Sequence, residues 1–97
     1  MTKMAEKLLE KVSHKQELIL RDKQLAVIPE PLKYVTEAFD SLLVLDLQDN
    51  NISEIDGDFC KNLPRLQKLD LRNNKIKTIS MHIKALMNLN VLKLDFN

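Results

Sequence analysis

The side chains that most often perform chemistry in proteins are sparse in this sequence. Its two histidines, His14 and His82, lie far apart, and neither has a second histidine, a cysteine or a carboxylate pair at the spacing of a metal site. Cys60 is the only cysteine, and a catalytic Cys–His arrangement would need a third, orienting group. We therefore expect no catalytic residue, no metal site, and a semi-buried Cys60 thiol of low reactivity.

Three carboxylates, Glu54, Asp56 and Asp58, surround Gly57, which is the only glycine. Carboxylates at such short intervals suggest a calcium site, but their spacing does not match a calcium loop of about twelve residues. We interpret the segment as a solvated turn. The single glycine also excludes the glycine-rich loops that bind phosphates and dinucleotides, so no cofactor is expected.

The composition indicates one folded domain with no strong preference for an anionic partner. The chain has 97 residues, of which 44% are hydrophobic and 30% charged, and 15 basic residues nearly balance 14 acidic ones. We therefore expect no binding to nucleic acid. No apolar run approaches the roughly 20 residues of a membrane helix, and the segment MTKMAEKLLEKVSHK lacks the apolar core of a secretory signal. With a lone cysteine, these features favour a cytoplasmic location and no membrane partner.

A pattern of leucine, asparagine and isoleucine recurs along the chain. One copy begins at Leu42 and the next begins 24 residues later at Leu66. Both have leucine, leucine, leucine, asparagine, isoleucine and isoleucine at the same offsets. A further copy runs from Leu89 to Asn97, and a degenerate one, without the asparagine, begins near Lys15. Repeats with periods of about 20–50 residues are typical of solenoids.

These residues resemble the leucine-rich repeat family, whose consensus is LxxLxLxxNxL. The resemblance covers residues 15–97 and implies an α/β solenoid with short parallel concave strands, helical or 3₁₀ convex returns and an N-terminal capping helix. Short intracellular members with such a cap helix look similar. We divide the single domain into a cap helix (1–14), a degenerate first repeat with a helical insertion (15–41), repeat 2 (42–65), repeat 3 (66–88) and a truncated repeat 4 (89–97).

The asparagines have a physical role in this arrangement. Where each strand ends, the chain turns, and its backbone polar groups point into the solenoid interior, where an unpaired group costs about 1–3 kcal/mol. An asparagine side chain both donates and accepts, so it can bind its own turn and the next coil. We predict that Asn50, Asn74 and Asn97 form a buried ladder.

The two ends of the solenoid need separate explanations. We predict a helix over residues 2–14, capped by Thr2, with Met4, Leu8 and Val12 in one apolar row that covers the first coil. A membrane-surface helix is the alternative, which the absence of aromatic anchors disfavours.

A second helix is predicted to begin near Pro31, with Leu32, Val35 and Phe39 inward.

The last copy stops at the asparagine position, so Leu89, Leu92 and Leu94 are predicted to form a strand with one uncovered face and edge. Two explanations compete. Either the sequence is the N-terminal piece of a longer repeat protein, which we favour, or the last coil is covered by self-association.

The surface left for function is the concave face, made of the strand residues that point outward. Val44, Asp46 and Gln48 alternate with inward leucines, and we expect Lys68 to pair with Asp46 or Asp70. The candidate partner-binding residues are Arg21, Val44, Asp46, Gln48, Lys68, Asp70, Arg72, Val91, Lys93 and Asp95. We expect a protein-interaction module that acts as a scaffold or regulator and binds a partner protein there. The alternative is an assembly role through self-association of the last coil, and a convex binding face also stays open.

Overall fold

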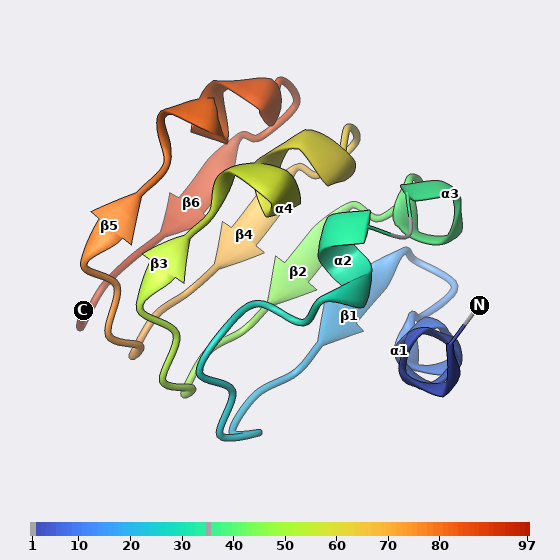
Figure 1. The fold of residues 1–97 in the computed structure, drawn as a ribbon, viewed down its shortest axis with the longest axis horizontal. Helices are drawn as coiled ribbons and strands as arrows, with labels where there is room; N and C mark the ends of the chain where they lie inside the picture. The colour runs from blue at the N-terminus through green and yellow to red at the C-terminus, as the bar shows by residue number, and fades with distance from the viewer. Residues whose placement is uncertain (1, 35) are drawn as a thin grey trace.

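The computed structural model describes residues 2–34 and 36–97 (Figure 1). Along the chain its elements are α1 (Lys3–Lys11), β1 (Glu17–Ile19), α2 (Pro31–Tyr34), α3 (Thr36–Phe39), β2 (Val44–Asp46), β3 (Glu54–Ile55), α4 (Gly57–Asn62), β4 (Lys68–Asp70), β5 (Thr78–Ile79), the 3₁₀ helix η1 (Met81–Ala85) and β6 (Val91–Lys93). None of the helices in this described part of the chain is long and apolar enough to span a bilayer.

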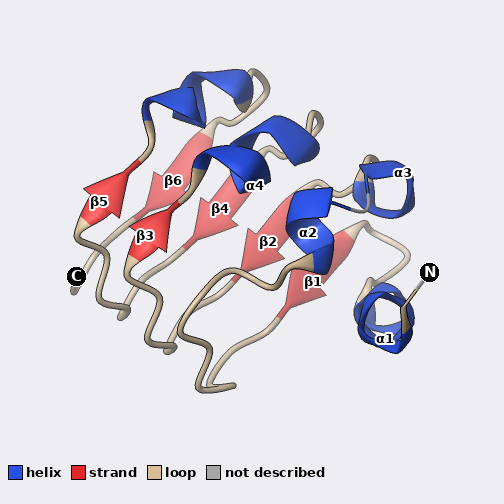
Figure 2. Cartoon of the chain, in the orientation of Figure 1, coloured by secondary structure: helices blue, strands red, loops and turns tan. Residues whose placement is uncertain are grey.

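The architecture is an α/β repeat solenoid. One sheet has the strand order β1-β2-β4-β6 with all neighbours parallel, and a second, two-stranded parallel sheet pairs β3 with β5. Figure 2 shows α2, α4 and η1 in a row on the side of the interior opposite the four-stranded sheet, while α1 lies at the β1 end. Each coil therefore runs from a concave strand to a convex helical return, as the sequence pattern predicts.

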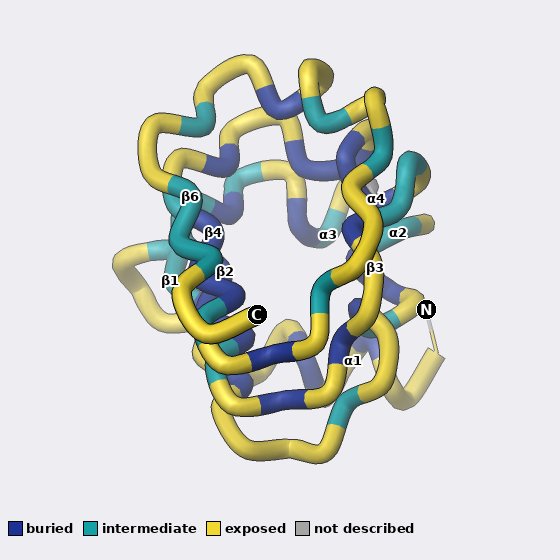
Figure 3. The backbone as a smooth tube through the Cα atoms, turned by 90° about the vertical axis from the view of Figure 1, so that its left-hand side faces the viewer, coloured by how far each residue is buried: buried dark blue, intermediate teal, exposed yellow. Residues whose placement is uncertain are grey.

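Buried residues lie both on the strands and on the convex helices (Figure 3), and their side chains form one core cluster. Inward leucines stack in register, because Leu18 pairs with Leu45, Leu45 with Leu69 and Leu69 with Leu92. The first three are fully buried, whereas Leu92, on the edge strand β6, is only partly buried. Phe59, from α4, is also fully buried in this cluster. Burial of such side chains stabilises each coil by about 1.5–3 kcal/mol per residue.

Asparagines at matching positions join successive coils through the backbone. Each amide nitrogen donates to a leucine carbonyl of its own coil and to one of the preceding coil. Each amide oxygen accepts from a backbone N–H of the preceding coil. These residues are Asn50, Asn74 and Asn97. The bonds thus reach the preceding coil, not the next one as expected.

The ladder is also less uniform in burial than the sequence predicts. Asn50 and Asn74 are buried, whereas Asn97 is exposed, because the described residues place no coil on its other side. The residue just before each asparagine has a left-handed backbone, with φ of 60° at Asp49, 57° at Asn73 and 62° at Phe96. Aspartate and asparagine tolerate this conformation, but a bulky phenylalanine adopts it rarely.

The cap helix begins as predicted and ends earlier. The Thr2 hydroxyl accepts a hydrogen bond from the N–H of Ala5 at 3.1 Å, which makes Thr2 the N-cap. The helix stops at Lys11 and not at residue 14, because the Ser13 hydroxyl binds the N–H groups of Lys15 and Glu17 and so stabilises a turn.

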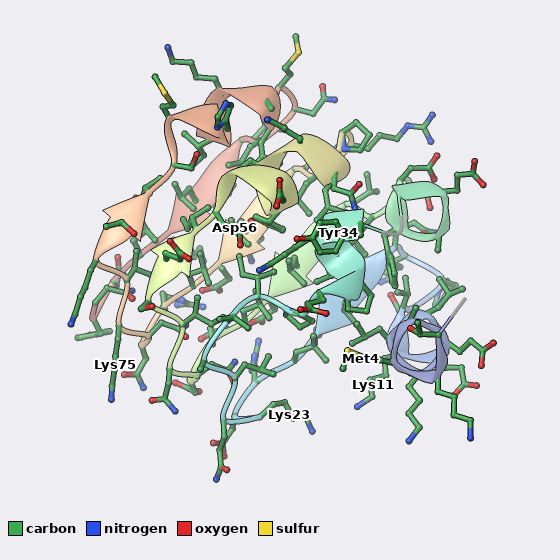
Figure 4. The ribbon with its side chains drawn as sticks, viewed as in Figure 1. Met4, Lys11, Lys23, Tyr34, Asp56 and Lys75 are labelled. Atoms are coloured by element: carbon green, nitrogen blue, oxygen red, sulfur yellow. The ribbon has the colours of Figure 1, made fainter. Side chains whose placement is uncertain are left out.

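The apolar row of α1 is only partly covered. Leu8 and its neighbour Ala5 are buried, while Met4 is 57% exposed, contrary to the expected inward row. Met4 lies near the start of the helix, and Figure 4 places it close to the α2 segment. The α1 contacts with the first coil therefore come from its middle turns.

The predicted helix near Pro31 is present as two short helices, α2 and α3. Leu32 and Phe39 point into the core as expected. Val35, which was also expected to be inward, lies outside the described residues. The 3₁₀ return at Met81–Ala85 and the α-helical return at Gly57–Asn62 agree with the helical or 3₁₀ convex returns that the resemblance implies.

Candidate functional site

The outward side chains of the four-stranded sheet form three rows across the strands. The strand register aligns the first two rows, and the parallel backbone hydrogen bonds continue beyond the strands to align the third. The first row is Glu17, Val44, Lys68 and Val91. The second row is Ile19, Asp46, Asp70 and Lys93. The third row is Arg21, Gln48, Arg72 and Asp95.

Asp46 is held by a dense set of hydrogen bonds in the middle of this face. The Arg21 guanidinium donates from Nε to Asp46 Oδ2 at 2.9 Å, and its Nη2 forms an ion pair with the same oxygen at 2.7 Å. The Gln48 side chain donates to both carboxylate oxygens, and the Gln48 backbone N–H donates to Oδ1. Asp46 is only 6% exposed, whereas the Arg21 side chain is 54% exposed. The acid therefore lies beneath the arginine that neutralises it.

Asp70 has the same arrangement within a single coil. The Arg72 guanidinium binds both of its carboxylate oxygens, at 3.0 Å from Nε and at 2.8 Å from Nη2, and the Arg72 backbone N–H also donates to the carboxylate. Asp70 is 1% exposed. Burial by itself raises the pKa of the Asp70 carboxyl, but the hydrogen bonds and charge of Arg72 outweigh it, so the pKa is lowered.

Asp46 and Asp70 lie on the outward side of the sheet as expected, but both side chains are buried. Lys68 was the expected partner of these acids, but it forms no ion pair among the described residues. Each acid is bound instead by an arginine that lies two positions beyond the end of a strand. Lys68 is in register with Val44, one row away from the two acids. An arginine fork can bind both oxygens of a carboxylate at once, which a lysine cannot do.

The other candidate residues stay accessible. Val44, Gln48, Lys68, Arg72 and Lys93 are half-buried, while Arg21, Val91 and Asp95 are exposed. The structure therefore brings all ten candidate residues onto one face, and eight of them are at least partly exposed.

The Asp70–Arg72 pair predicts how stability depends on pH. Because the folded-state pKa of Asp70 is lowered, its contribution is fully present above the unfolded-state value of about 4 and is lost as the pH falls through the folded-state pKa. In Arg72→Gln, burial without the arginine would raise the pKa of Asp70, so the contribution of Asp70 to stability would fall as the pH rises. The stability difference between the unchanged chain and Arg72→Gln should therefore be small at pH 3 and grow toward pH 6, measured by urea denaturation at each pH.

Lys77→Gln is the matched control, because it removes the same charge from an exposed side chain that has no ion pair among the described residues. A stability difference for Arg72→Gln that is constant between pH 3 and pH 6 would contradict the assigned role of Asp70.

The convex side contains polar contacts that the sequence did not reveal. Asp56 caps α4 by accepting from the N–H of Phe59 at 2.8 Å, and it forms an ion pair with Lys33 of α2 at 3.1 Å. The Tyr34 hydroxyl donates to Asp58 at 3.3 Å. Figure 4 shows Tyr34 and Asp56 where α2 and α4 adjoin. The acidic segment thus joins two convex helices. The interpretation of this segment as a solvated turn is wrong, because Glu54 lies in β3, Asp56 is the N-cap of α4 and Asp58 lies in the first turn of α4.

Two further convex contacts involve asparagines outside the ladder. The buried Asn62 amide donates to the Leu32 carbonyl at 2.8 Å, and the exposed Asn88 amide donates to the Pro64 carbonyl at the same distance. No periodic signal identifies either residue, because each bond depends on how neighbouring returns stack.

Cys60 and His82 are the potentially reactive side chains whose surroundings the structure describes most fully. Burial raises the pKa of the Cys60 thiol to about 11, so it is protonated at neutral pH and poorly nucleophilic. Cys60 is fully buried, more than the semi-buried position expected. His82 Nδ1 lies 3.2 Å from Ser80 Oγ, and that hydroxyl also accepts from the His82 N–H as the N-cap of η1.

His82 is exposed, and His14 lies beyond the end of α1. The described residues contain no group of three histidine, cysteine, aspartate or glutamate side chains suited to a metal ion.

Known proteins share the repeat pattern. A model described as leucine rich repeat matches residues 40–97. The chain is 35% identical over 86 residues to the "Protein phosphatase 1 regulatory inhibitor subunit PPP1R7 homolog" of Arabidopsis thaliana, an alignment that covers 89% of this chain and 24% of that protein. It is 32% identical over 94 residues to osteomodulin of Bos taurus, with 97% of this chain and 21% of that protein covered.

Epiphycan of Mus musculus is 50% identical over 42 residues, which make up 43% of this chain and 13% of that protein. The chain thus spans about a quarter or less of the length of these curated relatives.

Proposed function

This chain belongs to the leucine-rich repeat family, and from that premise we propose that its concave face binds a partner protein, in the role of a scaffold or regulator. Protein binding is the general role of the family's extended concave surfaces. The phosphatase regulatory subunit among the relatives supports a regulatory role and suggests a phosphatase as the first partner to test.

The observation that carries this proposal is the combination of exposed apolar residues and fixed charges on the concave face. Ile19 and Val91 are exposed apolar residues at the two ends of the sheet, at 51% and 39%. In the third row, Arg21 and Arg72 are held in place by Asp46 and Asp70. Apolar contacts beside polar groups whose conformation is already fixed favour binding, because less side-chain entropy is lost.

A pair of matched substitutions tests which face binds. Val91→Glu places a charge on the concave face. Val27→Glu places the same charge in the first coil, at an exposed position that corresponds in the repeat to strand β3. The catalytic subunit of protein phosphatase 1 is the first purified probe, and cell extract is the second. We expect a partner to be retained by Val27→Glu and to bind Val91→Glu at least about tenfold more weakly, which corresponds to about 1.4 kcal/mol. Equal retention by both variants would rule out the concave face.

A second candidate function is assembly through the last coil. The edge strand β6 pairs with β4 on one side, and Leu89, Leu92 and Leu94 stay partly exposed. Sedimentation at several concentrations separates the candidates, because self-association that disappears in Leu92→Glu would support assembly. Self-association unchanged by this substitution, or none at all, would leave the partner-binding proposal as the better one.

The proposal includes a cytoplasmic location and no catalysis. The buried, protonated Cys60 suits a reducing compartment, where free thiols persist. One relative is named as a regulatory subunit of a phosphatase and another is osteomodulin, and neither name describes an enzyme.

A further inference from the structure

The two arginines of the concave face have hydrogen-bond donors left over after binding their acids. An arginine side chain has five N–H donors in a fixed plane. Arg21 uses Nε and Nη2 on Asp46, and Arg72 uses Nε and Nη2 on Asp70. The Nη1 group of each, with two N–H donors, makes no hydrogen bond to the protein among the described residues.

The acids beneath them have no comparable capacity to bind a partner. Both oxygens of Asp46 accept from Arg21 or Gln48, and both oxygens of Asp70 accept from Arg72. With exposures of 6% and 1%, these carboxylates lie below the surface that a partner would touch. The centre of the concave face thus presents donors and almost no free acceptors.

The two guanidinium groups lie over neighbouring strands. Asp46 and Asp70 are register partners on β2 and β4, so their backbones are about 4.8 Å apart. Arg21 reaches from the first coil across to Asp46, which brings it one strand away from Arg72. Hydrogen bonding to Asp46 raises the pKa of Arg21, and the charge of Arg72 acts in the opposite direction.

We infer that Arg21 and Arg72 together bind one carboxylate, supplied by an aspartate or glutamate side chain of the partner protein, an inference that rests on the proposed function. A carboxylate has two oxygens and about four acceptor positions, which match in number the unused Nη1 N–H groups of two neighbouring guanidinium groups. It also relieves the repulsion between the two cations.

The surroundings favour an acidic segment over a single acid. Lys93 continues the row of Asp46 and Asp70, and Lys68 lies in the adjacent row. The face therefore contains four cations and two buried anions, while the acidic Glu17 and Asp95 lie at opposite corners, with Asp95 next to Arg72 in the third row. A partner segment with further acids beside the anchoring carboxylate would be attracted to Lys68 and Lys93.

The experiment selects ligands from a random-peptide phage library and then changes the peptides. The immobilised chain is the bait, and fluorescence anisotropy measures the affinity of the selected peptides. We expect enrichment of aspartate and glutamate, and we expect replacement of the anchoring acid by its amide to weaken binding at least about tenfold. Because this comparison changes only the peptide, it does not depend on how a protein variant folds.

Protein variants then assign the acid to its site. Arg21→Gln/Arg72→Gln should lose the preference for acid over amide, whereas Lys75→Gln/Lys77→Gln, which removes the same charge next to β5, should keep it (Figure 4 labels Lys75). Circular dichroism checks that each variant is folded.

The outcomes separate the inference from the proposed function. Suppose that Val91→Glu weakens the binding of the selected peptides, but that the peptides bind equally well with the acid or its amide. This result would overturn the inference and support the proposed function. Peptides that Val91→Glu does not affect, or a selection that yields none, would count against both. Tighter binding of phosphoserine at the anchoring position would overturn the assignment of a carboxylate.

Discussion

Replacing Asn74 with leucine is expected to lower the free energy of unfolding by about 3 kcal/mol. The Asn74 amide oxygen accepts from the Ile52 N–H at 3.1 Å, and the amide nitrogen donates to the Leu47 and Leu71 carbonyls. Leucine would leave the buried Ile52 N–H without a partner. The two carbonyls would each keep one donor, because Asn50 also binds Leu47 and Asn97 also binds Leu71.

Urea denaturation measures this change, with Lys77→Ala as the control. Lys77 is exposed one turn away in the same coil, and its replacement should change stability by less than about 0.5 kcal/mol. If the two variants unfolded at the same urea concentration, Asn74 would not have the stabilising role that its hydrogen bonds indicate.

Replacing Phe59 with alanine is expected to have the largest effect, a loss of about 3–5 kcal/mol. Phe59 extends from α4 into the core and is fully buried, so its removal leaves a cavity between two coils. Because a single domain is usually stable by only about 5–15 kcal/mol, the variant should be close to unfolded at 37 °C. Thermal unfolding followed by circular dichroism provides the measurement.

Phe96→Ala is the matched control for this substitution. Phe96 is 81% exposed, so the same change of side chain removes almost no buried surface. The melting temperature should therefore stay within a few degrees of that of the unchanged chain. A similar loss of stability in both variants would show that Phe59 does not fill the core as the structure describes.

Much of the fold is readable from local patterns. Leu45 and Leu69 point inward because alternation along a strand assigns successive residues to opposite faces, and the constant intervals place equivalent residues side by side. Thr2 caps the first helix because its hydroxyl needs only a neighbour three residues away. Such features depend on short segments and on the repeat itself.

The candidate site was only partly readable. The pattern placed Asp46 and Asp70 on the outward side correctly, but it gave no measure of depth on that side. Their burial depends on Arg21 and Arg72, and Arg21 is 25 residues away from Asp46 in the sequence. The partners of an acid across a sheet depend on the reach of side chains from adjacent coils, which periodicity does not encode.

The ends of the chain show the same division. The apolar spacing of α1 predicted Met4 in the covered row, yet only the middle of the helix contacts the first coil. Amphipathic spacing states which side of a helix is apolar, whereas tertiary packing decides how much of that side is covered.

The sequence by itself determined the repeat, the inward leucines, the asparagine positions and the absence of glycine-rich phosphate loops, because each follows from residue types at fixed intervals. Only the tertiary structure decided that the concave acids are buried beneath arginines, that each asparagine binds the preceding coil, and that α2 and α4 are joined through Lys33 and Asp56. These contacts join residues from different coils, and their geometry exists only when the coils are stacked.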